Sequence, residues 1–486
     1  MQSAGNGADT LMQRARPGAL ALVMAKHGAL AALLFGPPLI WALAEGQMDL
    51  ALALCAPILL GLIVWLSTWR QPLPDDLRGV EAMASIALLF LLAALLSIPA
   101  FMVLGLGPAS ALFEGMSAIT TTGLSVAPDP DSWPFAAHVL RSWMQWCGGL
   151  AMATAVLALV LGPGPAARTI GKAGIDDRNR IQSARSQARE LLGAYALLTI
   201  GFALAIALAV QDGPEGFVLA LSAISTGGFA PRSDSLGSYT PFAQGVVILA
   251  CLAGAVSLLA FTQTLRRNGT PIWRSESVRR VGLATLACAV ALAAVMAVTD
   301  TTDTYVPTLL NLISALTTAG YATGSMPVTT ALLAVFILAM VVGGDRGSTA
   351  GGLKLSRLGI TARATRHALT LPRLPERAIS PLRYQGATIK DTFLVALLGL
   401  IILYILSVGA VWMILLSLGF PALPALFDTV SALSTVGLST GVIGPDLPDS
   451  AQLVLAFAMW LGRLEFIAVI VLFLPGTWMG RLSTKG

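Results

Sequence analysis

Four copies of one eight-residue motif, rich in threonine and glycine, are the residues of this chain best suited to bind a ligand. They occupy residues 117–124, 222–229, 314–321 and 431–438 and share the pattern Ser-Ala-Ile/Leu-Ser/Thr-Thr-x-Gly-Leu/Phe/Tyr. Backbone carbonyl oxygens can replace the hydration shell of a cation, and glycine adopts the backbone angles that turn successive carbonyls to one side. Four such segments around one axis would present rings of oxygens to a dehydrated cation, with threonine hydroxyls at the inner end.

The elements around each motif follow one order. A long apolar stretch comes first, then a short half-apolar stretch, the motif and a second long apolar stretch, and this unit occurs four times from residue 84 onward. Non-helical backbone at membrane depth is tolerated where it is buried in protein or lines a water-filled path. Threonine and glycine are also common packing residues in membrane helices, but that explanation does not account for four copies in register.

The composition of the whole chain indicates that these units lie in a membrane. Of 486 residues, 56% are hydrophobic and 11% are charged, whereas an average soluble protein has about 25% charged residues. Because about 20 apolar residues cross a bilayer, the apolar runs predict ten spans. These lie near residues 19–44, 51–69, 84–106, 135–161, 191–210, 242–265, 281–298, 330–342 continuing past a break, 393–418 and 453–474. The sequence therefore predicts an all-α integral membrane protein with about ten transmembrane helices and four pseudo-repeated helix, pore loop and helix units around one central pore.

The basic residues predict the orientation of the chain, because cytoplasmic loops retain lysine and arginine. Bases cluster on alternate loops, including residues 168–189, 266–280 and 354–390, which predicts cytoplasmic termini. The opposite loops are acidic, either because acids have little influence on orientation or because they concentrate cations. The net charge of +5 is thus a topology signal, and no nucleic-acid partner is expected. The basic loops are expected to contact a soluble partner or anionic lipid.

No catalytic or metal-chelating constellation is evident in the sequence. The four cysteines lie in apolar runs, where each is expected to be a small buried hydrophobic residue. The three histidines, His27, His138 and His367, share no motif. We therefore expect no enzyme activity and no covalent or organic cofactor.

The fourfold motif resembles that of the Trk/Ktr/HKT superfamily of potassium uptake proteins, and the two extra N-terminal spans are similar to its bacterial TrkH branch. The resemblance implies a single chain that imitates a tetrameric potassium channel. In this superfamily a serine in place of the first filter glycine is associated with sodium permeation, so four glycines favour potassium. The residues implied to bind potassium are Thr121, Thr122, Gly123, Thr226, Gly227, Gly228, Thr318, Ala319, Gly320, Thr435, Val436 and Gly437.

A glycine-rich run at residues 343–353 interrupts the eighth span. Its glycines each cost a helix about 1 kcal/mol relative to alanine, and in relatives the corresponding segment is a flexible gating loop under the filter. The gate residues that the resemblance implies are Gly343, Gly344, Gly347, Ser348, Thr349, Gly351, Gly352 and Arg463. Asp345 and Arg346 depart from the family pattern, and we expect them to neutralise one another in a turn.

Further charged residues within the apolar part of the chain are expected to act at the predicted filter or gate. Arg463 lies in a family-like Gly-Arg-Leu-Glu sequence. It either impedes ions below the filter or is neutralised by carbonyl groups, with Glu465 as a structural brace. Glu114 and Asp428 each precede a motif serine by three residues. They are expected to brace the filter by accepting loop N–H bonds, with a proton relay as the alternative.

These observations predict potassium uptake across the bacterial inner membrane through a selective, gated, channel-like pore. The alternative is a symporter that couples potassium to protons or sodium. The resemblance further implies a homodimer and a cytosolic nucleotide-binding regulatory ring similar to TrkA, since this chain has no nucleotide-binding glycine motif. The predicted divisions are an N-terminal helix pair (1–83) and pore repeats at 84–190, 191–280, 281–391, with the gating loop at 343–353, and 392–486.

Overall fold

The computed structural model describes residues 14–72, 77–161, 177–266, 269–299, 304–324, 326, 329–373, 375, 380–384 and 387–478. For residues 155–161, 177–185 and 387 it describes the backbone alone. Six of the bases on the predicted cytoplasmic side lie outside the described residues: Arg168, Lys172, Arg267, Arg377, Arg481 and Lys485.

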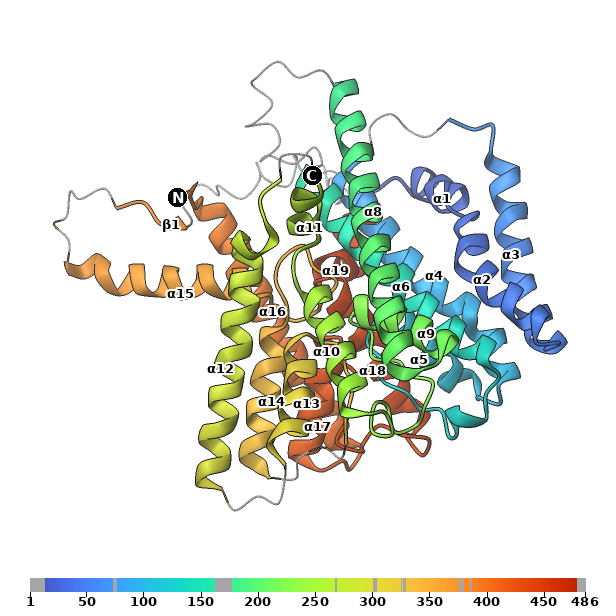
Figure 1. Cartoon of the computed structure of the whole chain (residues 1–486). Coiled ribbons are helices and arrows are strands. Elements are labelled where there is room, and N and C mark those ends of the chain that lie inside the picture. The colour runs from blue at the N-terminus through green and yellow to red at the C-terminus, as the bar shows by residue number, and fades with distance from the viewer. Residues whose placement is uncertain are drawn as a thin grey trace.

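Long apolar helices dominate the fold and run in a common direction (Figure 1). Within the described residues, six helices are long and apolar enough to cross a membrane, or up to eight if each bent pair forms one span. Helices suit this setting because every backbone N–H and C=O group must be bonded internally where water is absent. The N-terminal group comprises α1 (Pro17–Lys26), α2 (Leu30–Ala44) and α3 (Met48–Thr68).

Four units then repeat one order of elements, as the sequence predicts. The leading helices are α4 (Gly79–Val103), α8 (Asp177–Val210), α12 (Glu276–Val298) and α16 (Asp391–Ser417). The short helices are α5 (Pro108–Ile119), α9 (Gly213–Ile224), α13 (Tyr305–Leu316) and α17 (Ala422–Leu433). The helices that follow the motifs are α6 (Phe135–Leu161), α10 (Pro241–Ala255), α14 (Thr330–Val342) and α18 (Asp449–Arg463). This order confirms the predicted fold class.

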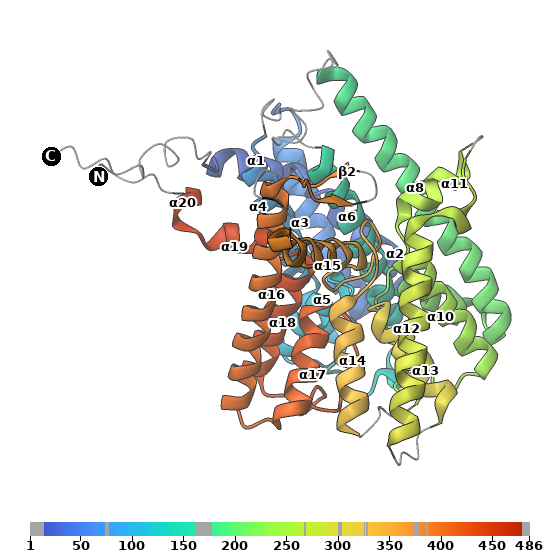
Figure 2. The same ribbon diagram turned by 90° about the vertical axis from the view of Figure 1, so that its left-hand side faces the viewer.

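Breaks follow three of these last helices. The α10 axis meets α11 (Leu258–Leu265) at 89°, and the α18 axis meets α19 (Ile467–Phe473) at 118°. After α14 and the glycine-rich run, α15 (Leu355–Thr370) lies across the direction of the long helices and is seen nearly end-on in the perpendicular view (Figures 1 and 2). Within the described ranges, the exception to the all-helical fold is an antiparallel pair of two-residue strands, β1 (Arg383–Tyr384) and β2 (Ala387–Thr388). The remaining elements are η1 (Pro130–Ser132), η3 (Ile272–Arg274), η4 (Leu371–Arg373) and α20 (Pro475–Trp478).

Burial distinguishes the short helices from the long ones. Residues 218–224 of α9 and 427–433 of α17 are all buried. By contrast, α12 leaves Leu283 and Val290 59% and 61% exposed. Apolar side chains on the outside of a membrane protein lose nothing by this exposure, since lipid tails are as apolar as leucine. The short helices and the motifs at their ends therefore form the centre of the fold.

Candidate functional site

Each motif begins as the last turn of a short helix and ends as a loop. In the first motif, the N–H group of Thr121 donates to the Ala118 carbonyl (3.1 Å) and that of Thr122 to the Ser117 carbonyl (2.9 Å). The equivalent pair of bonds occurs in the other three motifs. This arrangement is a Schellman cap, which closes a helix when a residue just beyond its end adopts a left-handed backbone. The eight-residue pattern thus contains the signal that stops the helix.

The left-handed residue in each cap is a threonine, where glycine is the usual choice. Thr121, Thr226, Thr318 and Thr435 have φ angles of 55°, 53°, 55° and 51°. A β-branched residue in this region is a genuine outlier, and such strain costs on the order of 1–3 kcal/mol. Four equivalent strained residues indicate that the side chain has a function that glycine would lack. What threonine adds to the inner end of each loop is a hydroxyl group.

The four motif glycines interlock in a closed ring. A Cβ atom placed on Gly123 would lie 2.1 Å from the carbonyl oxygen of Gly227 in the second motif. A Cβ atom placed on Gly228 would likewise lie 2.1 Å from the Ala319 carbonyl oxygen. The same atom on Gly320 would lie 2.1 Å from the Val436 carbonyl oxygen, and on Gly437 it would lie 2.2 Å from the Thr122 carbonyl oxygen. The order runs through motifs one to four and returns to the first. The structure therefore brings together all four triplets of predicted filter residues.

Two of the four threonine hydroxyls at this ring are buried without a hydrogen-bond partner among the described residues. These are the Oγ1 atoms of Thr121 and Thr435, and a buried hydroxyl without a partner costs about 1–3 kcal/mol by mutational measures. The other two have partners: Thr226 donates to the Ser225 carbonyl (2.7 Å), and Thr318 accepts from the Gly351 N–H group (2.7 Å). The unpartnered oxygens suit a cation that would complete their coordination.

Side chains three residues before the motif serine hold the loop that follows three of the motifs. The acceptors are all buried. The bonds run from Val126 N–H to Glu114 (2.9 Å), from Thr323 N–H to Asn311 (2.7 Å) and from Thr440 N–H to Asp428 (3.0 Å). The prediction that the two carboxylates accept loop N–H bonds is confirmed.

The second motif has Leu219 at this position, and a glutamine from the first unit supplies bonds to it instead. Gln145 of α6 donates from Nε2 to the Gly227 carbonyl (2.6 Å), and its Oε1 accepts from the Ser222 hydroxyl (2.7 Å). Its side chain also fills the space beside Gly227, where a Cβ atom would lie 2.3 Å from Gln145 Cδ. Sequence reasoning missed Gln145. The signal that could have found it was the apolar residue at Leu219, where the other motifs have a polar one.

A buried arginine, also missed, links the first two units. Arg141 Nε lies 3.6 Å from Glu114 Oε2, and the guanidinium carbon stands 3.9 Å from the centroid of the Phe229 ring. The residue is 3% exposed. Because an arginine within an apolar span is costly and usually marks a functional position, its place in α6 was the available signal.

The glycine-rich run lies against the inner ends of the motifs. Thr349 donates its hydroxyl to the Ile224 carbonyl at the end of α9 (2.9 Å), and Gly351 donates its N–H group to Thr318 Oγ1 (2.7 Å). A Cβ atom on Gly351 would lie 2.0 Å from the Ser434 carbonyl oxygen. The run therefore touches the second, third and fourth motifs at once.

The other predicted gate residues of this run shape its backbone. Gly343, Gly347 and Gly352 have φ angles of 67°, 78° and 71°, which glycine adopts without strain. Ser348 donates its hydroxyl to a carbonyl within the same turn (2.6 Å). A Cβ atom on Gly344 would lie 2.5 Å from a neighbouring alanine side chain. These contacts give the run a defined conformation.

Arg463 holds the run from the fourth unit. Its Nη1 donates to the Thr349 carbonyl (2.8 Å) and its Nη2 to the Gly148 carbonyl (3.5 Å). Neutralisation by carbonyl groups, one of the two predicted alternatives, is therefore observed, and one of those carbonyls belongs to the run itself. Glu465 forms its ion pair with Arg357, at 2.6 Å, and makes no direct bond to Arg463 among the described residues.

Asp345 and Arg346 do not neutralise one another, contrary to the prediction. Asp345 Oδ2 lies 3.1 Å from Nη2 of Arg280 in α12, while the Arg346 side chain is exposed. Arg280 is in a different span from Asp345, so the local sequence contained no sign of this pairing.

Several acids of the opposite loops have structural partners. Asp131 accepts two hydrogen bonds from Ser233 (2.6 and 2.7 Å), and Glu215 Oε2 lies 3.0 Å from Arg232 Nη2. Burial, together with the neighbouring Glu215 carboxylate, raises the pKa of Tyr239 above its usual value. These partners favour the simpler interpretation, in which the acids of these loops serve the local structure.

A membrane-spanning α-helical protein built from four pseudo-repeated units, with an interlocked ring of backbone oxygens at its centre, is the class that this fold and site define. The family model for TrkH, described as a cation transport protein, matches residues 92–285 and 283–478. Since these matches cover most of its length, the chain belongs to the TrkH family of cation transport proteins, which is not a family of enzymes.

Similar proteins span most of this chain. The Trk system potassium uptake protein TrkI of Halomonas elongata is 28% identical over 473 residues, which cover 92% of this chain and 94% of the relative. An uncharacterized cation transporter of Methanocaldococcus jannaschii is 27% identical over 416 residues, or 83% and 84% of the two chains. The crystal structure of the potassium transporter TrkH from Vibrio parahaemolyticus superposes with a TM-score of 0.82 at 22% identity, covering 96% of this chain and 100% of that one. The two proteins share one fold.

Proposed function

We propose that this protein takes up potassium through a pore whose filter is the ring of the four motif loops. The observation that carries the proposal is the ring itself, in which each motif glycine faces a carbonyl oxygen of the next motif with no space for a side chain. The four short helices end at this ring, so the negative ends of their dipoles favour a cation there. The unpartnered hydroxyls of Thr121 and Thr435 offer further oxygen ligands.

Potassium is the proposed ion for two reasons. All four ring positions hold glycine, the residue that the family resemblance associates with potassium. The similar proteins of Halomonas elongata and Escherichia coli are named potassium uptake proteins.

Rescue of a potassium-uptake-deficient bacterial strain tests the filter. Wild type should restore growth at low potassium, whereas Gly123→Ser and Gly437→Ala should not, because each new side chain meets a carbonyl oxygen at about 2 Å. Gly409→Ala in α16 is the matched control, since nothing lies within 4 Å of a Cβ atom there. Full rescue by both ring variants would remove the filter assignment.

We also propose that residues 343–353 form the gate of this pore. The support is their contact with three motifs at once and with Arg463. Deleting residues 347–351 should raise potassium flux in proteoliposomes that contain this chain alone. An unchanged basal flux would count against the gate.

The alternative is symport with protons or sodium, in which Glu114 or Asp428 would relay protons. Both carboxylates accept hydrogen bonds from the loops, and Glu114 also faces Arg141, which supports a positioning role. Uptake that follows a potassium gradient alone supports the pore. Uptake that requires a proton gradient and loses this requirement in Asp428→Asn supports symport.

The proposed setting is the bacterial inner membrane, with both termini in the cytoplasm. The N–H group of Ala15 donates to the Thr477 carbonyl (3.0 Å), so the two ends of the described chain lie on one side. We propose that the protein acts as a homodimer and that its basic cytoplasmic segments contact a TrkA-like nucleotide-binding ring. Light scattering on the purified protein tests the dimer, and labelling of cysteines added at the termini tests the orientation. The five divisions of the chain remain predictions.

A further inference from the structure

The N-terminal helices α1 to α3 belong to none of the four repeated units. Helices α2 and α3 lie at one edge of the molecule (Figure 1), and α2 packs against α6, the helix that follows the first motif. The turn before α2 is in close contact with α3, because a Cβ atom on Gly61 would lie 2.4 Å from the Gly28 carbonyl oxygen. The N-terminal helices therefore form a closely packed support beside α6.

A proline in α2 leaves a backbone carbonyl group available to a side chain of α6. Pro37 lies inside α2 and has no N–H group, so the Leu33 carbonyl, four residues earlier, loses the donor that an α-helix normally supplies. Trp143 of α6 donates its Nε1–H group to this carbonyl (2.9 Å). In a membrane, a neighbouring helix can satisfy a backbone group that proline has freed. The contact therefore joins α6 to one defined position of α2.

Glu45, directly after α2, holds the first turn of α6. Its Oε2 atom accepts from the Ala136 N–H group (3.1 Å), and its Oε1 atom accepts from the indole N–H group of Trp41 (3.0 Å). The first N–H groups of a helix have no partner within it, and a carboxylate beside them is favourable. The Trp41 ring also packs against Phe135, with ring centroids 5.3 Å apart. Helix α2 and the residue after it thus hold α6 at its start and again at Trp143.

The same segment of α6 contacts the proposed filter from another side. Arg141 and Gln145 are each two positions from Trp143, which corresponds to about 200° around an α-helix. Gln145 donates to the Gly227 carbonyl (2.6 Å), and the Arg141 guanidinium carbon stands 3.9 Å from the centroid of the Phe229 ring. Helix α6 therefore lies between the N-terminal helices and the second motif.

Close packing on its other sides leaves α6 little room to move without disturbing the motifs. A Cβ atom on Gly148 would lie 1.9 Å from the Ile119 carbonyl oxygen at the end of α5. The Trp143 ring stacks on Trp146, and Trp146 stacks on Tyr195 of α8, with ring centroids 5.0 Å apart in each pair. Interiors packed in this way transmit strain. A shift of α6 at Trp143 would therefore move the side chains that contact the second motif.

We propose that Trp143 and Glu45 are positioning residues of the filter, through which the N-terminal helices set its preference among ions. Both residues fix α6 against α2, and Gln145 of α6 in turn fixes the Gly227 carbonyl. The placement of carbonyl oxygens around an ion determines which ion they favour. The inference rests on the proposed filter, because the Gly227 carbonyl is one of its ligands.

Trp143→Phe tests the contact with α2, because it removes the Nε1–H donor and keeps an aromatic ring for the stack. Competing rubidium, potassium and sodium uptake is measured in proteoliposomes that contain the full chain. The preference for potassium over sodium should fall by about two- to tenfold, the factor that corresponds to one typical hydrogen bond. Trp478→Phe is the matched control, since it removes an indole bond to the Leu472 carbonyl (2.9 Å) at the C-terminal end of the described chain. An equal fall in both variants would overturn the proposal.

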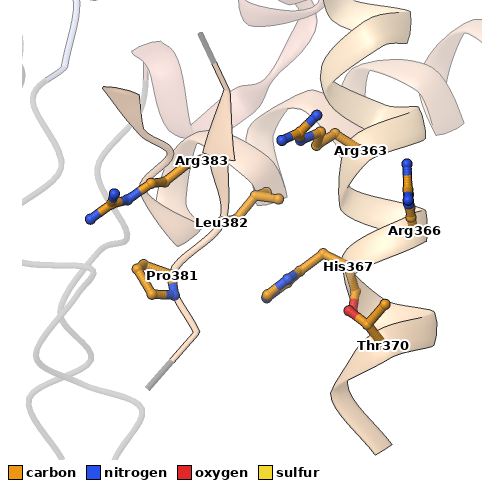
Figure 3. Close-up of a pocket in the computed structure, with 7 residues that line it drawn as sticks. All are labelled: Arg363, Arg366, His367, Thr370, Pro381, Leu382 and Arg383. Atoms are coloured by element: carbon orange, nitrogen blue, oxygen red, sulfur yellow. The ribbon is translucent and has the colours of Figure 1, made fainter. Parts of the chain in front are cut away.

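Glu45 allows a graded test in the same assay. Glu45→Ala removes both acceptor atoms and should lower the preference, whereas Glu45→Gln keeps one acceptor oxygen and should retain more of it. Asp49→Ala is the matched control, an exposed acid in the first turn of α3. Arg366→Gln, an exposed side chain of α15 (Figure 3), controls for a change of charge on another helix. Both controls should match wild type, and a wild-type preference in Glu45→Ala would overturn the role of Glu45.

A double variant tests whether Trp143 acts through Gln145. Trp143→Phe combined with Gln145→Met should lose no more ion preference than Gln145→Met alone, because both changes act on one carbonyl. Additive losses would overturn this route, and a lower melting temperature of Trp143→Phe with a wild-type preference would reduce Trp143 to a structural residue. Retained uptake in Gly123→Ser would instead overturn the proposed filter. Loss of uptake in Gly123→Ser, with a wild-type preference in Trp143→Phe and Glu45→Ala, would overturn the positioning role and leave the filter intact.

Discussion

Replacing Gln145 with methionine tests the hydrogen bond that a motif carbonyl receives from another unit. Methionine is already present at the equivalent place in the fourth unit, as Met459. The equivalence follows from Gly148 and Gly462, which each lie three residues further on and pack against the same carbonyl of their respective motifs. The substitution therefore keeps the side-chain length and removes the amide.

The expected magnitude follows from two buried hydrogen bonds. Gln145→Met removes the donor to the Gly227 carbonyl (2.6 Å) and the acceptor for the Ser222 hydroxyl (2.7 Å). Each buried group left without a partner costs about 1–3 kcal/mol, so we expect the free energy of unfolding to fall by about 2–6 kcal/mol. The Gly227 carbonyl also becomes free to reorient within the proposed filter. A free energy of about 1.4 kcal/mol corresponds to a factor of ten in a binding constant. If the lost bond is worth about that much to potassium binding alone, the preference for potassium over sodium should fall by about tenfold.

Ion preference is measured as competing rubidium, potassium and sodium uptake into proteoliposomes, and stability as thermal unfolding in detergent. Gln244→Met is the matched control, since it removes two buried amide bonds, to the carbonyls of Leu236 (2.8 Å) and Tyr239 (3.1 Å), outside the ring. The control should lower stability and keep the ion preference. Unchanged preference in Gln145→Met, or an equal change in both variants, would refute the reasoning.

Three other predictions follow from the site. Thr121→Val and Thr435→Val should each raise the free energy of unfolding by about 1–3 kcal/mol, because neither buried hydroxyl has a partner among the described residues, but should lower potassium uptake; normal uptake in both would exclude their role as ligands. Glu114→Ala should destabilise the protein by about 3–5 kcal/mol, because it leaves Arg141 as an unpaired buried charge, and an unaltered melting temperature would contradict this. Arg463→Gln should raise basal flux, because it removes the donor to the glycine-rich run; flux no higher than wild type would count against this contact as part of the gate.

The repeated units and their motifs could be predicted from the sequence because their physical causes are local. A run of about 20 apolar residues is sufficient to specify a membrane helix. Within each motif, the Schellman cap joins residues at most five apart, as in the bond from Thr122 to Ser117. The bracing bonds of Glu114 and Asp428 span twelve residues within one unit, so the fourfold comparison was enough to identify them.

The partners that lie in other units could not be predicted in this way. Gln145 is 82 residues from Gly227, and Arg280 reaches Asp345 from another span. A single sequence contains no periodic signal for contacts at such separations. The expectation for Asp345 failed for this reason, since adjacency in the chain suggested Arg346 while the packing of α12 against the run selected Arg280.

The sequence by itself determined a membrane protein of four repeated units, the twelve residues at their motifs and the glycine-rich interruption, because helix length, helix termination and backbone freedom depend on neighbouring residues. Only the tertiary structure decided that the motifs close into a ring in chain order, that the run lies against three of them, and that Gln145, Arg141 and Arg280 hold these parts together. Those features depend on how separate helices pack, and buried polar groups take whichever partner the packing brings within hydrogen-bond distance.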